Sequence, residues 1–138
     1  MPYKMNKRDA LIKSKRSIPA QVQPVVMPVI VCLCGSTRFK DEFVKANLRE
    51  TLNGKIVLSI GCDMRTDSEI FGMTSPDQDT WTEEQKDIKQ RFDELHKRKI
   101  DLADEILVLN IGGYIGKSTR SEIEYAEAHG KMVRYLET

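Results

Sequence analysis

The sequence predicts one α/β domain built on a parallel β-sheet of about four strands. The chain has 138 residues, enough for a single hydrophobic core that needs neither a metal nor disulfides to hold it together. Four apolar runs with strand character alternate with helical patterns, at Val25–Leu33, Lys55–Gly61, Glu105–Asn110 and Met132–Leu136. This alternation predicts parallel strands, right-handed crossovers and helices on both faces of the sheet. The first run is apolar throughout, as in strands buried on both faces.

Three helices are expected between these strands, each with a start or stop signal. They run from Arg38 to Asn53-Gly54, from Thr82 to Ala103, and from Ser118 or Thr119 to Gly130. The second opens on a capping box, because Gln85 follows Thr82 by three positions. The polar stretch 62–81 is long for a compact domain, which favours a lid or a binding loop.

Charge is unevenly distributed along the chain. Residues 1–16 carry six basic groups against Asp9, a net +5 of the chain's total of +1, which leaves −4 for the rest. We therefore expect a basic, flexible extension at 1–24 and the α/β domain at 25–138. The extension could instead be an arm for nucleic acid, but Tyr3 is its one aromatic residue, and the acidic remainder argues against nucleic-acid binding.

Neither a membrane-spanning segment nor an export signal is apparent in the sequence. The longest mostly apolar run, Val25–Cys34, is far shorter than the ~20 residues that a spanning helix needs. The charged stretch 1–16 is not followed by the apolar segment of a secretory signal. We therefore expect a cytoplasmic protein without membrane contact.

The cysteines and histidines do not form a recognisable metal motif along the chain. The three cysteines are an odd number, and Cys32 and Cys34 would lie on one face of the first strand as reduced, buried thiols. The two histidines are His96 and His129, and no group of His, Cys and carboxylate residues has metal-ligand spacing. We therefore expect no metal ion and no cofactor.

The expected strand order is 2-1-3-4, the topology of flavodoxin-like and Rossmann-like sheets. Ligands of such sheets bind beyond the carboxyl ends of the strands, where successive crossovers go to opposite sides. Here that point lies between the first and third strands, where two loops meet, Gly35–Arg38 and Asn110–Thr119. The residues we expect to bind substrate in these loops are Gly35, Ser36, Thr37, Arg38, Asn110, Gly112, Gly113, Ser118 and Thr119.

Both loops have features of phosphate-binding sites, but the first fits such a site better than the second. Gly35–Arg38 joins a strand to a helix N-terminus, where backbone N–H groups and an arginine favour an anion. An ordinary strand-to-helix turn capped by Ser or Thr is the equally weighted alternative. The segment 112–119 resembles a P-loop but lacks the glycine required at position 111, which is isoleucine. A P-loop NTPase is therefore disfavoured.

Three further polar side chains are candidates for the same crevice. Glu122 lies in the first turn of the last helix, although Thr119 and Glu122 also have the spacing of a capping box. His96 lies two turns before the third strand, and its ordinary interpretation is a solvated helix position. Asp63 lies in the long polar loop and could touch a ligand.

Three motifs together resemble the nucleoside 2-deoxyribosyltransferase-like superfamily, which includes deoxyribonucleoside 5′-monophosphate N-glycosidases. They are Gly35-Ser36-Thr37-Arg38, the segment 103–109 (ADEILVL), and Thr119-x-x-Glu122-Ile123-x-Tyr125-Ala126-x-x-x-Gly130-Lys131. The resemblance implies cleavage of a nucleoside or nucleotide N-glycosidic bond, with Glu122 as the nucleophile, kept ionised by the helix N-terminus. It also implies ligand contacts from Gly35, Ser36 and Arg38, and a homodimer or larger assembly.

The chain departs from the family pattern at three positions. Gly116 stands where the transferases have an aspartate, Glu124 stands where a glycine is common, and His96 stands where a helix offers an aspartate to the substrate. In the nucleotide hydrolases a serine often replaces the first aspartate, a role that Ser118 would fill after a local shift. The alternative function is a protein of the same fold that binds or senses a nucleotide without chemistry.

Overall fold

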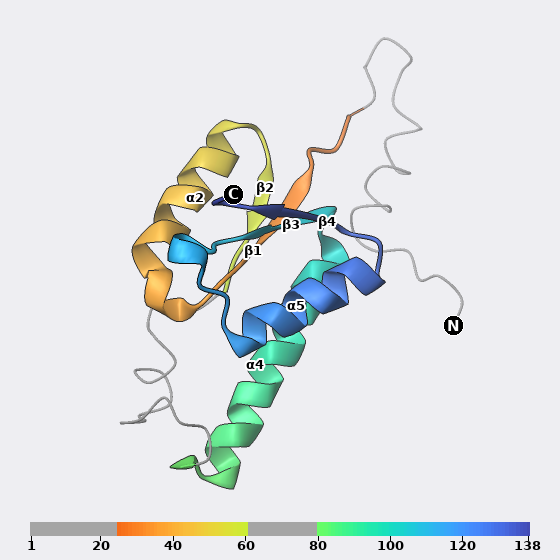
Figure 1. The fold of residues 1–138 in the computed structure, drawn as a ribbon. Coiled ribbons are helices and arrows are strands. Elements are labelled where there is room, and N and C mark those ends of the chain that lie inside the picture. Colours follow the sequence, from red (N-terminus) through yellow and green to blue (C-terminus); the bar gives the residue numbers. More distant parts are fainter. Residues whose placement is uncertain (1–24, 61–79) are drawn as a thin grey trace, which may run out of the picture.

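The computed structural model describes residues 25–60 and 80–138. The expected extension at 1–24, Asp63 and most of the polar stretch 62–81 lie outside the described residues. The described chain forms a four-stranded, all-parallel sheet in the order β2-β1-β3-β4 (Figure 1). The predicted α/β class and strand order are therefore confirmed.

The strands are shorter than the apolar runs that predicted them. They are β1 (Ile30–Cys34), β2 (Ile56–Leu58), β3 (Glu105–Val108) and β4 (Met132–Tyr135). Every residue of β1 is buried, as predicted for a strand covered on both faces. Residues 25–29 are not strand, and Val26 is exposed. The register of β1 with β2 begins at Ile30, and the Ile56 N–H donates to the Val29 carbonyl at 3.0 Å, whereas Pro28 has no N–H to extend the ladder.

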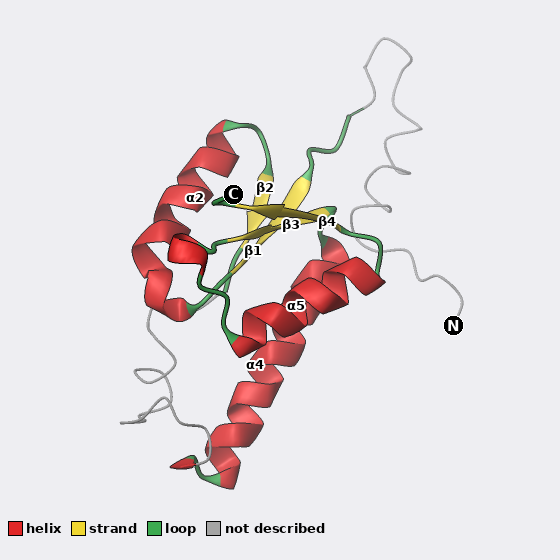
Figure 2. Ribbon diagram, in the orientation of Figure 1, coloured by secondary structure: helices red, strands yellow, loops and turns green. Residues whose placement is uncertain are grey.

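Helices cover both faces of the sheet, as the alternation predicted (Figures 1 and 2). On one face, α2 (Lys40–Leu52) packs Phe43 and Ala46 against Val31 and Leu33 of β1. On the other face lie α4 (Glu83–Leu102) and α5 (Lys117–Ala128), which pack against a core that includes Cys32 and Cys34. The strand's alternation therefore directs both thiols to the side of α4 and α5.

Two of the three helices begin at a different residue from the one predicted. The capping box of Thr82 and Gln85 opens α4 as expected. A short 3₁₀ turn, Thr37–Phe39, precedes α2, which starts at Lys40 instead of Arg38. Helix α5 starts at Lys117 after Gly116. The predicted start at Ser118 or Thr119 is therefore wrong, and both residues lie inside the first turn.

The face under α2 also holds a group of four charged residues, which we call the ion network: the buried Glu50 and Glu105 and the half-buried Lys55 and Arg134. The Lys55 ammonium donates to Glu105 at 2.8 Å, and the Arg134 guanidinium donates to both Glu50 and Glu105. Two carboxylates, from α2 and β3, thus face two cations, from β4 and the turn before β2.

None of the described helices has the length and apolar composition needed to cross a bilayer.

Candidate functional site

The two loops predicted to meet at the switch point do meet. The Leu109 N–H after β3 donates to the Cys34 carbonyl at the end of β1, at 2.8 Å. The Arg38 guanidinium lies 4.0 Å from the centre of the Tyr114 ring, a cation–π contact between the loops. A Cβ at Gly35 would lie 3.1 Å from the Leu109 Cβ. Glycine therefore allows the close approach of the two loops.

The loop after β1 is built as a capped turn. The Ser36 hydroxyl accepts a hydrogen bond from the Arg38 N–H at 3.3 Å and caps the 3₁₀ turn. Arg38 is exposed. This is the geometry of the ordinary capped turn, and it presents an exposed arginine beside the loop after β3.

The loop after β3 is held by the end of the chain. Asn110 and the Glu137 backbone exchange two hydrogen bonds of 2.9 Å. The Gly112 N–H donates to the Glu137 carboxylate at 3.1 Å. Gly112 and Gly113 have φ of 65° and 80°, conformations that favour glycine. The turn therefore does accept a carboxylate, and in this structure Glu137 provides it.

Polar contacts join the start of α5 to α4. The Lys89 ammonium pairs with Asp93 at 2.6 Å and donates to the Ser118 hydroxyl at 3.1 Å. Thr119, the next residue, is buried. Ser118 thus connects the two helices, and Thr119 is buried within the first turn of α5.

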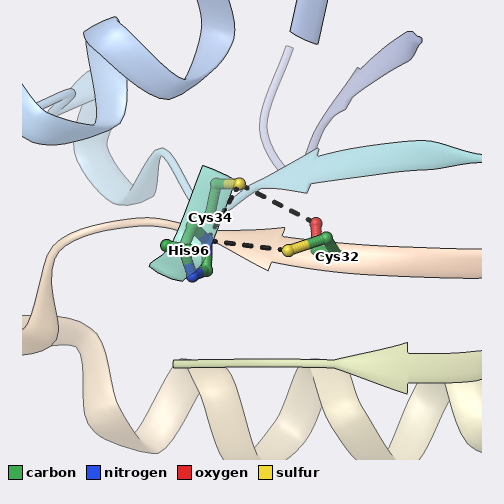
Figure 3. Close-up of side chains that lie close together, drawn as sticks. All are labelled: Cys32, Cys34 and His96. Carbon is green, nitrogen blue, oxygen red and sulfur yellow. Dashed lines mark hydrogen bonds between the residues drawn. The ribbon is translucent and has the colours of Figure 1, made fainter. Parts of the chain in front are cut away.

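Four buried side chains gather between β1 and the helices α4 and α5, and we call them the Cys–His–Glu cluster: Cys32, Cys34, His96 and Glu122. The His96 Nε2 lies 3.6 Å from the Cys32 sulfur and 3.5 Å from the Cys34 sulfur (Figure 3). The Glu122 Oε2 lies 4.0 Å from the same nitrogen. The sequence brings these residues from β1, α4 and α5 to one point at the carboxyl end of β1.

The structure corrects the two ordinary interpretations of His96 and Glu122. His96 is not a solvated helix position, because it is only 7% exposed and faces both thiols. Glu122 does not form a capping box with Thr119, because the N-cap of α5 is Gly116 and Thr119 lies within the helix. Glu122 is 8% exposed, and its Oε2 has no hydrogen-bond partner among the described residues.

Burial and close contacts shift the protonation of the whole cluster. A hydrogen bond from Cys34, supported by His96, lowers the pKa of Cys32 to about 5 although burial opposes this. The same hydrogen bond, together with burial, raises the pKa of Cys34. Burial works to lower the pKa of His96, but contacts with Cys32 and Glu122 raise it.

The pKa of the Glu122 carboxyl moves in the direction opposite to our expectation. Burial raises it to about 7, and the neighbouring His96 offsets only part of this effect. The expectation that the helix N-terminus keeps Glu122 ionised is therefore wrong, because loss of water around the carboxylate outweighs the helix dipole.

The structure also corrects the view that no residues are arranged to hold a metal. The sulfurs of Cys32 and Cys34 and a ring nitrogen of His96 all lie within 4.8 Å of one another. Sequence spacing could not show this, since His96 is 62 positions from Cys34. The available signal was that Cys32 and Cys34 share a strand face and that His96 precedes the core residue Ile100 by one helical turn.

An open groove of about 450 Å³ lies on the outer side of α4, away from these residues. It is lined by Asp87, Gln90, Arg91, Glu94, Leu95 and Arg98. None of these residues was predicted to bind substrate, and none belongs to the Cys–His–Glu cluster.

The chain matches no protein-family model, and no curated protein or solved structure matches it significantly. The class of protein is therefore defined by the fold itself, a parallel α/β domain whose β1 and β3 loops meet at the switch point. Its function has to be argued from the side chains near that point.

Proposed function

We propose that the protein cleaves the N-glycosidic bond of a nucleoside or nucleoside 5′-monophosphate, as a hydrolase or deoxyribosyltransferase-like enzyme, with Glu122 as the nucleophile. The observation that carries the proposal is the Glu122 carboxylate at the carboxyl end of β1, with a buried Oε2 that no described residue satisfies. A buried carboxylate oxygen without a partner is costly to stability, so a functional role explains its presence.

The chemistry needs only this carboxylate and a water molecule. A Glu122 oxygen attacks the anomeric carbon of the sugar while the bond to the base breaks. The base nitrogen keeps the electron pair of that bond and takes a proton from solvent. Water then hydrolyses the glycosyl ester, which returns the carboxylate and frees the sugar. His96 and Lys89 both favour the ionised carboxylate that the first step requires.

The surrounding loops suit a nucleotide. Arg38 stands exposed at the edge of the crevice beside Tyr114, and its guanidinium can bind a phosphate with two hydrogen bonds. Loss of the Glu137 contact would free the Gly112 N–H for a ligand oxygen. We place this activity in the cytoplasm, where buried thiols such as Cys32 and Cys34 stay reduced.

The test is a chromatographic screen for free base released from ribo- and deoxyribonucleosides and their 5′-monophosphates. We expect release by wild type and a loss of roughly 10³-fold or more in Glu122→Gln, since the amide cannot act as the nucleophile. Glu124→Gln is the matched control, because Glu124 is an exposed glutamate on the same helix. Equal release by wild type and a folded Glu122→Gln would refute the proposal.

A second candidate is a nucleotide-binding or sensing protein without chemistry. It is favoured by the burial of Glu122 against His96, which would also suit a purely structural carboxylate. This candidate predicts no base release from any substrate. It also predicts that a nucleotide raises the melting temperature of wild type and Glu122→Gln equally.

We also propose that the protein forms a homodimer or a larger homo-oligomer. Three apolar side chains spaced four residues apart on α2, Val44, Leu48 and Leu52, are 58%, 61% and 76% exposed. Rows of this kind are commonly covered by another subunit. Light scattering should give at least twice the chain mass of 15.8 kDa. A monomer at micromolar concentration would contradict this expectation.

A further inference from the structure

We propose that Cys32, Cys34 and His96 bind a zinc ion, with Glu122 as the fourth ligand. This inference goes beyond the proposed function and does not depend on it. It rests on the geometry of four buried side chains that three separate elements bring together.

The distances from His96 to the two thiols already fit zinc, and the three ligand atoms lie within 4.8 Å of one another. A tetrahedral zinc ion with bonds of about 2.3 Å to sulfur and about 2.05 Å to nitrogen holds a sulfur and the nitrogen about 3.5 Å apart. The observed separations from the His96 Nε2 are 3.6 Å to the Cys32 sulfur and 3.5 Å to the Cys34 sulfur. An ion could therefore enter between these three atoms with little movement of the side chains.

Glu122 supplies the remaining position. Its Oε2 lies 4.0 Å from the His96 Nε2, and a tetrahedral site would bring the two atoms to about 3.4 Å. This oxygen is buried without a hydrogen-bond partner in the described part of the chain. A small rotation of the side chain would bring it to the ion, which would satisfy an otherwise uncompensated carboxylate.

The donor set selects the kind of metal. Two thiols and an imidazole are soft or borderline ligands, which favour zinc over magnesium or calcium. Both cysteines are fully buried and free of disulfides. With both thiols ionised, the two sulfurs and the carboxylate would carry three negative charges around the dication. Zinc takes the place of the protons that the thiols otherwise share with His96, so binding releases protons.

The alternative is that the two cysteines are ordinary core residues. Buried cysteines commonly act as small hydrophobic side chains. This does not account for the histidine and the glutamate in the same place, because the rest of that core is built from residues such as Ile100, Ile106 and Val108. Two polar, ionisable side chains among these residues are costly unless a partner compensates them.

The test is metal binding by the full-length chain, measured without substrate. The protein is unfolded in denaturant that contains a chelator, which removes any bound metal. It is then refolded without the chelator in the presence of Co²⁺, which takes the place of zinc, and examined by absorption spectroscopy. We expect one Co²⁺ per chain, with thiolate-to-cobalt charge-transfer bands and the visible bands of tetrahedral Co²⁺, and displacement of Co²⁺ by Zn²⁺. Absence of charge-transfer bands in folded wild type would overturn the proposal.

Variants assign the ligands. Cys34→Ser and His96→Gln should weaken binding by roughly 100-fold or more, whereas the matched control His129→Gln should bind as wild type, since His129 is exposed. Glu122→Gln should weaken binding by about 10-fold and keep the charge-transfer bands. Wild-type affinity in His96→Gln would overturn the site, and wild-type affinity in Glu122→Gln would overturn the fourth ligand.

A measurement on wild type alone covers the case in which Cys34→Ser does not fold. Zinc bound to Cys32 and Cys34 should slow their alkylation by at least about 10-fold, as read by mass spectrometry of the modified peptides. An unchanged alkylation rate at both cysteines in saturating Zn²⁺ would overturn the proposal.

The two proposals meet at Glu122 and can be separated there. One carboxylate cannot be a zinc ligand and a nucleophile at the same time, so the zinc-loaded chain is expected to release no base. Metal binding without base release in the metal-free protein would refute only the proposed function. Base release without metal binding would refute only the zinc site.

Discussion

The two faces of the sheet each hold a group of ionisable side chains, and the groups differ in how they are paired. Under α2, the ion network sets two carboxylates against two cations, and the Arg134 Nε is its one buried side-chain atom without a hydrogen-bond partner among the described residues. Under α4 and α5, the Cys–His–Glu cluster sets a single imidazole against two thiols and a carboxylate, so its charges are not balanced in the same way. Its pKa values are shifted in both directions, and one carboxylate oxygen is unsatisfied.

This difference separates a structural group from a functional one. Charges that neutralise one another need nothing further, and the removal of one partner costs stability because it leaves the other charge uncompensated. A cluster that remains unsatisfied within its own fold has ligand atoms to offer, either to a substrate or to a metal. The comparison therefore predicts opposite responses to substitution on the two faces.

The largest effect is expected from breaking the ion network. Arg134→Met leaves Glu50 and Glu105 with Lys55 as their one remaining cation, so the free energy of unfolding should fall by about 3 kcal/mol. Urea unfolding measures it. Arg91→Met is the control, since the pair of Arg91 with Asp87 is exposed and should contribute less than about 1 kcal/mol. Similar losses in both variants would contradict a special role for the network.

Zinc binding should have the next largest effect on stability, and it should act only through the Cys–His–Glu cluster under α4 and α5. At a free Zn²⁺ concentration of 100 times the dissociation constant, the native state gains about 2.7 kcal/mol. The melting temperature of wild type should therefore rise on zinc addition, whereas His96→Gln, which binds at least about 100-fold more weakly, should gain no more than about 0.4 kcal/mol. Mg²⁺ serves as the control ion. A rise of equal size in both proteins would show that zinc binds elsewhere.

Sequence reasoning reached the fold and the meeting of the two loops, because both depend on local periodicity and on parallel topology. Alternation along β1 was also enough to place Cys32 and Cys34 on one face. Sequence reasoning did not predict that His96 lies against these two thiols. Helix α4 carries apolar residues on more than one side, and the sheet buries the row of His96 and Ile100 while Leu95 and Leu102 stay exposed.

The burial of Glu122 was not predicted, for a different reason. The spacing of Thr119 and Glu122 is compatible with a capping box, and only the true start of α5 at Lys117 decides against it. A shift of three residues in the N-cap, from Thr119 to Gly116, thus changes a cap into a buried carboxylate. Such boundaries depend on the preceding loop, here the turn through Gly112 and Gly113, which propensity alone does not determine.

Two glutamate-to-glutamine substitutions should differ in sign in the metal-free protein. Glu105→Gln removes a carboxylate paired with Lys55 and Arg134, and should cost about 1–3 kcal/mol of unfolding free energy. Glu122→Gln replaces an unsatisfied buried carboxylate with a neutral group, and should stabilise the protein by about 1 kcal/mol. Urea midpoints with a chelator present measure both. Destabilisation of equal size would mean that the two faces are paired alike.

The smallest effect is the dependence of the Glu105 contribution on pH. Burial opposes ionisation, but Lys55 and Arg134 lower the pKa of Glu105 below its ordinary value. The Glu105 carboxyl therefore binds a proton less tightly in the native state than in the unfolded chain. Its ionised form stabilises the fold at pH values above the unfolded-state pKa of about 4.3. This contribution is lost as the pH falls through the lower pKa of the folded state.

The stability difference between wild type and Glu105→Gln should be constant from pH 5 to 7 and shrink in more acid solution, as followed by urea unfolding at each pH. Glu124→Gln, at an exposed position, should show no such trend, and a Glu105→Gln difference that grows with acid would reverse the assigned sign.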